Sequence, residues 1–342
     1  MLKSFQMKTI PGILLCLAIA APSWFLGKLF PVAGGPVVAI AVGIIVAAAA
    51  SCHKPPRINV DAGIAFTSKK LLQYAVILLG FEMDLFHVAR VGGQSLYVML
   101  FTLAAAFATA WGVGKMLKIA GNTTTLIGVG TAICGGSAIA ATAPVLRAKD
   151  EEVARAISTI FLFNIAAVFI FPALGRAMNL DDADFGMWAG TAINDTSSVV
   201  AAGTAWSNAA GNDNALAFAT IVKLTRTLAI VPITLFLAVR MSRNQARAAA
   251  SGFHFAKVFP WFVLFFAGAA VLNTFAGLPN EFSGGLVVCG KFFINMAMAA
   301  IGLKTNLKSL VSNGYKPILL GLCCWFAVTA VSLVVQFFTP AS

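Results

Sequence analysis

Two short segments combine glycine with polar side chains inside an otherwise apolar sequence. Residues 130–137 read GTAICGGS and residues 190–198 read GTAINDTSS, so both begin with the same four residues 60 positions apart. The apolar segments that follow them end in Pro172 and Pro232, again 60 apart. In a membrane-embedded chain, irregular or polar backbone survives only where protein or a water-filled cavity surrounds it. We therefore expect these two segments to bind a solute.

The first motif interrupts a long apolar segment. Gly135 and Gly136 allow the backbone to leave helical geometry, and Ser137 is placed to cap a helix that restarts toward Arg147. A restarted helix presents free N–H groups and the positive end of its dipole, which together form a site for an anion. We predict that residues Cys134 to Ser137 bind an anion. Close packing of helices through small residues is the alternative.

The second motif places an acid within an apolar region. An acidic side chain inside a membrane span is costly and usually functional. We predict that Asp195 binds a coupling proton or Na⁺, or pairs with a base. Its neighbours offer amide and hydroxyl groups to an oxyanion: Asn194, Thr196, Ser197 and Ser198. A surface loop is the alternative if this segment does not cross.

Two basic residues lie near the centre of the next apolar segment. Lys223 and Arg226 are three positions apart and share one helix face. Asp195 can neutralise one of them, which leaves positive charge for a bound anion. Arg matches the fork geometry of an oxyanion and Lys acts as a point charge. We predict that both contact the anion, with a structural Lys–Asp–Arg network as the alternative.

The composition defines the class of protein that must position these residues. Of the 342 residues, 59% are hydrophobic and 11% are charged, and the mean hydropathy is +0.89. A soluble domain carries about 25% charged residues. We predict an all-α polytopic membrane protein with residues 1–342 as one domain. The net charge of +12 comes from basic residues in short loops, which indicates topology and no nucleic-acid partner.

About eleven segments can cross a bilayer if each span needs roughly 20 residues. They lie near residues 10–30, 34–51, 62–86, 94–117, 122–146, 156–176, 183–209, 214–239, 258–278, 282–303 and 317–338. Counting both polar motifs as spans, the basic loops predict that the N-terminus is inside and the C-terminus outside.

Catalytic signatures are absent from the sequence. It contains no HExxH, no GxSxG and no pair of membrane-embedded aspartates, and Ser137 has no histidine at membrane depth to activate it. The six cysteines show no CxxC spacing. We expect no enzymatic activity, no cofactor and no metal site.

Four stretches resemble the YeiH family of bacterial membrane proteins, which are described as sulfate exporters. They are TAICGGSAIAATAPVLRAKDEEVARAIS at 131–158, FGMWAGTAINDTSSVVAAG at 185–203, ATIVKLTRTLAIVP at 219–232 and AMAAIGLKT at 297–305. Histidine often precedes the acid in that family, whereas this chain has Asn194. This departure argues against a mechanism that uses a titrating histidine there.

The resemblance implies a relation to the bile-acid, arsenite and cation/proton antiporter-like transporters. It implies inverted five-helix repeats, broken helices, elevator-like alternating access, a homodimer and a place in the bacterial cytoplasmic (inner) membrane. The repeats would cover about 34–176 and 183–338, with 1–31 as an extra N-terminal helix. A second internal similarity, between 75–85 and 297–307, gives a different register, and both registers stay open.

We predict a secondary active transporter of a small anion, with sulfate or a related oxyanion or sulfonate first. A proton- or Na⁺-coupled carrier of an organic acid is one alternative, in which Asp195 is the main ligand and Lys223 its counter-ion. An anion channel or a membrane sensor is the alternative from another class.

Overall fold

A computed structural model describes most of the chain as helix. The described residues are 2–29, 35–51, 60–230, 232–233, 236–237, 260–276, 278–305 and 314–338, and every regular element in them is helical. Six of the described stretches are long and apolar enough to cross a bilayer: Thr9–Leu29, Asp61–Glu82, Leu85–Met116, Asp150–Ala177, Glu281–Lys304 and Tyr315–Phe338. The predicted all-helical, multi-pass class is confirmed. The predicted spans 214–239 and 258–278 lie partly outside the described residues.

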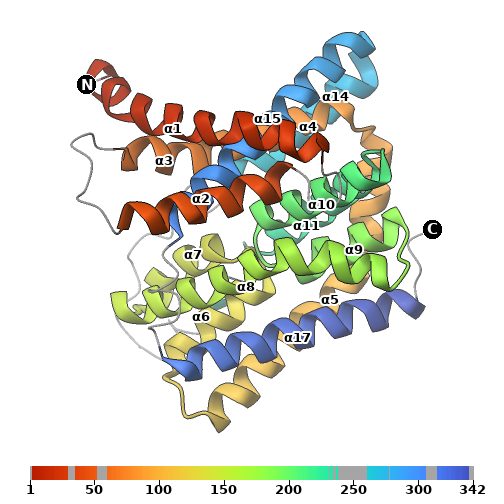
Figure 1. Ribbon diagram of the computed structural model, residues 1–342. Coiled ribbons are helices and arrows are strands. Elements are labelled where there is room, and N and C mark those ends of the chain that lie inside the picture. The colour runs from red at the N-terminus through yellow and green to blue at the C-terminus, as the bar shows by residue number, and fades with distance from the viewer. Residues whose placement is uncertain are drawn as a thin grey trace.

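One group of helices forms an outer layer, at the top of Figure 1. It comprises α1 (Leu2–Leu29), α2 (Gly35–Ser51), α3 (Asp61–Phe66), η1 (Thr67–Leu71), α4 (Leu72–Leu79), η2 (Gly80–Glu82), α14 (Trp261–Ala276) and α15 (Asn280–Lys304). Glycine allows two of these contacts. A Cβ at Gly43 of α2 would lie 2.6 Å from the carbonyl oxygen of Ala299 in α15, and one at Gly12 of α1 would lie 2.1 Å from that of Val60. These helices therefore touch backbone to backbone.

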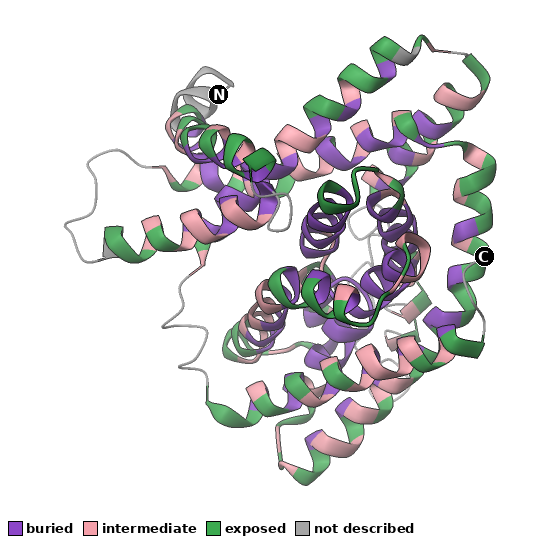
Figure 2. Cartoon of the chain, turned by 45° about the vertical axis from the view of Figure 1, so that its right-hand side comes forward, coloured by how far each residue is buried: buried purple, intermediate pink, exposed green. Residues whose placement is uncertain are grey.

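The second group contains the two polar motifs. It comprises α5 (Leu85–Met116), α6 (Gly121–Ala132), α7 (Gly136–Leu146), α8 (Asp150–Ala177), α9 (Asp182–Ala192), α10 (Thr196–Ala210), α11 (Asn214–Leu228) and α17 (Tyr315–Phe338). The long helices α5 and α17 pack against each other and against α6 and α9. Figure 2 shows the most completely buried helices in the middle of the molecule, so the long helices shield the short ones.

Helices α6 and α7 form a hairpin. Asn122 at the start of α6 donates a hydrogen bond to Glu152 at the start of α8, over 3.2 Å. Leu126 of α6 and Ala143 of α7 belong to the same buried cluster. At 1.5 Å per residue, helices of 12 and 11 residues reach only about half of a 30 Å hydrocarbon layer. Residues 122–146, predicted to cross once, instead turn back.

Helices α9 and α10 form a second hairpin. Trp206 near the end of α10 donates to the carboxylate of Asp182 at the start of α9, over 2.8 Å. The Trp206 ring also stacks on Phe185 with centroids 4.1 Å apart, and Arg176 at the end of α8 lies 5.9 Å from the Trp206 ring. Residues 183–209, also predicted to cross, therefore return to the end of α8.

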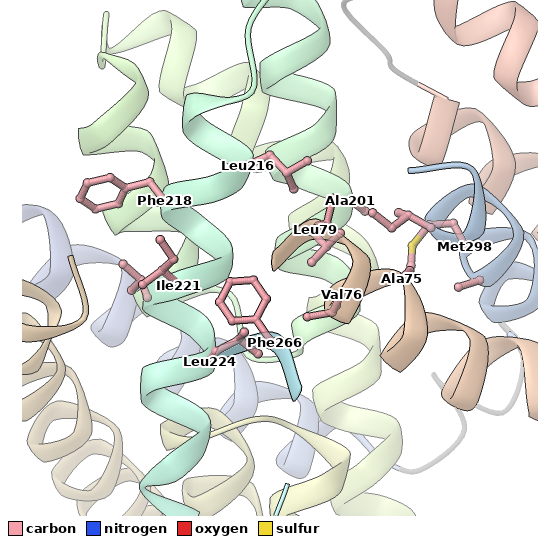
Figure 3. Close-up of a cluster of buried hydrophobic side chains, with 14 of the residues drawn as sticks. Ala75, Val76, Leu79, Ala201, Leu216, Phe218, Ile221, Leu224, Phe266 and Met298 are labelled. Carbon is pink, nitrogen blue, oxygen red and sulfur yellow. The ribbon is translucent and has the colours of Figure 1, made fainter. Parts of the chain in front are cut away.

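The two hairpins start from opposite ends of α8. In Figure 1, α6 and α7 lie toward the left of the view, and α9 and α10 toward the right. Helix α11 follows α10 and packs closely along α9, where a Cβ at Gly190 would lie 2.7 Å from Val222. Figure 3 shows buried side chains of α4, α10, α11, α14 and α15 that join the hairpin region to the outer layer.

Candidate functional site

The tips of the hairpins meet each other. One tip is residues 133–135, between α6 and α7, and the other is residues 193–195, between α9 and α10. Gly135 has φ +66°, a conformation that favours glycine. A Cβ there would lie 3.5 Å from the Cβ of Asp195 and 3.4 Å from Nδ2 of Asn164. The structure thus brings the two polar motifs together.

Lys223 of α11 bridges the two tips. Its Nζ donates to the carbonyl of Ile133, over 2.8 Å, and to the carbonyl of Ile193, over 3.0 Å. The side chain is fully buried. One ammonium group therefore holds a backbone oxygen of each hairpin.

Arg226, one helical turn later, makes the same kind of contact with three groups. Nε donates to the carbonyl of Ala132 over 2.6 Å, Nη2 to that of Thr131 and Nη1 to that of Thr191. These carbonyls lie in the last turns of α6 and α9, which are the negative ends of the helix dipoles. Two fully buried cations thus cap two helix C-termini that converge.

Asp195 caps the helix that begins at the second tip. Its carboxylate accepts from the backbone N–H of Ser197, over 3.1 Å, and from the Ser197 hydroxyl. Among the described residues, the salt bridges are Arg155–Glu151 and Lys291–Asp213. Asp195 forms no direct ion pair in that set, but Lys223 lies within electrostatic range of its carboxylate. Asp195 also lines a cavity.

The cavity has a volume of about 520 Å³ and lies between the hairpin tips and the outer layer. The first turns of α7 and α10 form its inner end, while α8, α4, α14 and α15 contribute the walls. Its polar lining residues are Ser68, Lys69, Gln73, Ser137, Ser158, Asp195, Thr196, Ser197, Lys304 and Thr305. Gly135, the residue before α7, has no side chain to cap that helix, whereas α10 has Asp195. The N–H of Ala138 contacts the Cys134 thiol, so the inner end offers the backbone N–H groups of Gly136 and Ser137.

The predicted site residues divide into two sets. Those that line the cavity are Gly136, Ser137, Asp195, Thr196 and Ser197. Those buried around the tips are Cys134, Gly135, Asn194, Ser198, Lys223 and Arg226. The contact of Lys223 and Arg226 with an anion stays a prediction, since the hydrogen bonds of these side chains go to backbone carbonyls.

Sequence reasoning did not assign Lys69 and Lys304 to the site. Both line the cavity from the outer layer, opposite the tips. Two lysines at positions 69 and 70, at the start of an apolar span, are the available sequence signal, because such lysines normally extend to a polar region. The side-chain amide of Asn164, beside the first tip, is buried and has no hydrogen-bond partner among the described residues.

A second polar cluster lies at the other end of α10. Lys291 of α15 forms an ion pair with Asp213, in the connection between α10 and α11. Glu82 at the end of η2 lies within electrostatic range of both. The pair therefore links the hairpin region to the outer layer away from the cavity.

The family described as Conserved hypothetical protein 698 matches residues 11–321. A UPF0324 membrane protein of Streptococcus pyogenes serotype M6 is 50% identical over 337 residues, which cover 97% of this chain and 98% of the relative. A UPF0324 membrane protein of Streptococcus pneumoniae is 49% identical over 336 residues, with 97% and 98% covered. One of Fusobacterium nucleatum is 47% identical over 341 residues, with 95% and 96% covered.

Proposed function

We propose that this chain, which belongs to the Conserved hypothetical protein 698 (UPF0324) family and is a bacterial multi-pass membrane protein, is a secondary transporter of a small anion. Sulfate or a related oxyanion or sulfonate is the first candidate. The observation that carries the proposal is the cavity that ends at two helix N-termini and has Lys69 and Lys304 on its other wall. The proposal involves no covalent chemistry and no cofactor.

The charges around the cavity favour a negative ligand. Two lysines and one aspartate, Asp195, line it, so its formal charge is +1 (2 − 1). The first turn of α7, which has no cap from Gly135, adds the N–H groups of Gly136 and Ser137 and the positive end of a dipole. Hydroxyl donors come from Ser137 and Thr196 beside those N–H groups. This arrangement can replace part of the hydration shell of an oxyanion.

In this proposal Lys223 and Arg226 contribute through the backbone carbonyls to which they donate hydrogen bonds. Backbone carbonyls and half-helix C-termini are the groups that bind coupling Na⁺ in transporters with broken helices. Here the protein's own cations occupy five such carbonyls. We therefore assign coupling to a proton on Asp195. Protonation would raise the cavity's formal charge to +2, so the anion and the proton bind together.

We further propose a topology in which the hairpins enter the membrane from opposite faces. Removing two crossings from eleven leaves nine, which is still odd, so the N-terminus stays inside and the C-terminus outside. Lys149 then joins Lys115 and Lys118 on the cytoplasmic face, while Asp182 and Asp213 lie on the outer face. This arrangement follows the positive-inside rule better than eleven crossings do.

The 60-residue similarity fits this topology as an inverted pair. It relates α6, α7 and α8 to α9, α10 and α11, and the two hairpins start from opposite ends of α8. Inverted repeats with ligand sites at midplane helix breaks are a signature of secondary transporters. The resemblance to the YeiH family supports alternating access, with elevator-like movement and a homodimer as its implications. In this topology the cavity faces the cytoplasm.

The direct test measures uptake of labelled sulfate and methanesulfonate by proteoliposomes. Lys69→Gln removes a cavity charge and Lys70→Gln removes the adjacent exposed charge, which does not line the cavity. We expect Lys69→Gln to reduce the apparent affinity for both anions about tenfold and Lys70→Gln to leave it within twofold. Absence of saturable, counterflow-competent flux of either anion in the unmodified protein would refute the proposal. Ion currents without saturation would favour a channel instead.

A further inference from the structure

We propose that the transported anion has an apolar body, as in an alkyl sulfonate or an organic acid with several carbons, and that free sulfate is not the best ligand. This inference rests on the proposed anion transport and concerns the substrate class of the same cavity. Its basis is the size of the cavity and the distribution of apolar side chains along it.

The cavity is larger than an inorganic oxyanion needs. Its volume of about 520 Å³ lies within the range of roughly 300–1,000 Å³ that is typical of sites for organic ligands. A tetrahedral oxyanion held at the first turn of α7 would leave most of this space filled by water. A ligand with a carbon chain would displace that water.

The space beyond the anion site has apolar walls. Ile157, Phe161 and Ile165 lie at positions i, i+4 and i+8 of α8 and form one stripe along the cavity. Leu72 and Val76 line it from α4, again four residues apart. When an apolar group covers apolar surface that was exposed to water, the free energy of the complex falls. A fully hydrated dianion would gain nothing from these walls.

The apolar stripe begins beside the anion-binding end. A Cβ at Gly136, the first residue of α7, would lie 3.2 Å from the ring edge of Phe161. The buried, unpaired amide of Asn164 lies against the preceding residue, Gly135. An anionic head at the first turn of α7 therefore places the attached carbons on Phe161. This geometry matches an amphiphilic anion that binds with its charged group at the first turn of α7.

The binding test uses the full chain in phosphatidylcholine nanodiscs, titrated with sulfate, methanesulfonate, butanesulfonate and hexanesulfonate. We expect the affinity to rise about threefold to fourfold for each methylene until the wall is filled. Phe161→Ala should weaken butanesulfonate about tenfold and leave methanesulfonate within twofold. The control is Phe169→Ala in the same helix, where the side chain is 40% exposed and does not line the cavity. Leu72→Ala tests the facing wall if Phe161→Ala does not fold.

The outcomes separate this inference from the proposed function. Transport of sulfate with flat or falling affinity along the sulfonate series overturns the inference alone, whereas failure of every anion to bind overturns both. Equal binding of hexanol or hexyltrimethylammonium shows simple apolar partition and also overturns it. An anionic lipid could offer the same chemistry. If phosphatidylglycerol in the bilayer abolishes hexanesulfonate binding and butanesulfonate is not carried across, the ligand is a lipid headgroup and the inference is wrong.

Discussion

Lys223 and Arg226 show how backbone carbonyls, together with the nearby Asp195 carboxylate, can accommodate two buried cations. An unpaired charge is very costly to bury, yet both side chains are inaccessible to solvent. Five carbonyls at the negative ends of α6 and α9 receive their hydrogen bonds. The same bonds satisfy carbonyls that the helix breaks would otherwise leave without partners. The buried cations therefore need the carbonyls of the helix breaks as acceptors, and those carbonyls need the cations as donors.

Replacing Arg226 by Lys tests this interdependence. An ammonium group cannot reproduce the fork that reaches Ala132, Thr131 and Thr191 together, so at least one buried carbonyl loses its donor. We expect the free energy of unfolding to fall by about 2–4 kcal/mol, since each buried unsatisfied group costs about 1–3 kcal/mol. Thermal or chemical unfolding in detergent measures the change. Arg155→Lys, in an exposed pair with Glu151, is the control and should cost under about 0.5 kcal/mol.

Replacing Asp195 by Asn separates its charge from its capping role. Asn caps helices about as well as Asp, so the fold of α10 should persist. The variant resembles the protonated acid. We therefore expect the apparent affinity for sulfate in proteoliposomes to become independent of pH, whereas in the unmodified protein it should strengthen as pH falls. An unchanged pH profile in Asp195→Asn would assign coupling to another group.

The helix breaks at 133–135 and 193–195 are stable because each hairpin tip encloses the other. Backbone that leaves the helix inside a membrane must be enclosed by protein. Each tip supplies that enclosure for the other, with Gly135 against Asp195, and α11 closes the back through Lys223. A single tip would leave its carbonyls in hydrocarbon. The two hairpins thus stabilise each other as a unit.

Cysteine labelling distinguishes the hairpins from two crossings. Both Lys149→Cys and Ala210→Cys would be external if residues 122–146 and 183–209 crossed. In the hairpin arrangement Lys149→Cys is cytoplasmic and Ala210→Cys is external, because 147–149 returns to the side where α6 starts. A membrane-impermeant maleimide, applied to intact cells and to inverted vesicles of a cysteine-free variant, gives the answer. Met116→Cys, at an 81% exposed position at the end of α5, is the reference for the face that the proposed topology places in the cytoplasm.

For the whole molecule, the cavity and the Lys291–Asp213 pair lie at opposite ends of α10. The cavity separates the hairpin tips from the outer layer at one end. At the other end the ion pair holds α15 to the α10–α11 connection, next to Glu82. Alternating access would require this pair to separate when the cavity closes.

Charge reversal tests the role of this pair in transport. Lys291→Asp and Asp213→Lys each place like charges together, which favours separation of the two helix groups. We expect either variant to lower sulfate flux at least fivefold and to reduce labelling of Ser137→Cys from the cavity side. The double reversal restores attraction and should recover most of the flux. If the double variant is no better than the singles, the pair is not the contact that closes this side.

The sequence by itself determined the class of the molecule, the first helix break and the position of the second polar motif. Mean hydropathy and the low charge content require a membrane protein. The glycines at 135 and 136 act locally, so they mark the first break without knowledge of any partner, whereas the acid at 195 marked a polar site and the break beside it appeared only in the structure. The pairing of Lys223 and Arg226 on one face follows equally from their spacing.

Only the tertiary structure shows that each broken segment turns back on itself as a hairpin. An apolar sequence pattern indicates that a segment is buried, but it does not indicate the direction in which the chain continues. A hairpin and a single crossing of the same length therefore have the same pattern. The direction is set by contacts between distant residues, such as Asn122 with Glu152 and Trp206 with Asp182. The same is true of Lys69 and Lys304. Their part in the cavity depends on helices more than 200 residues apart meeting at one wall.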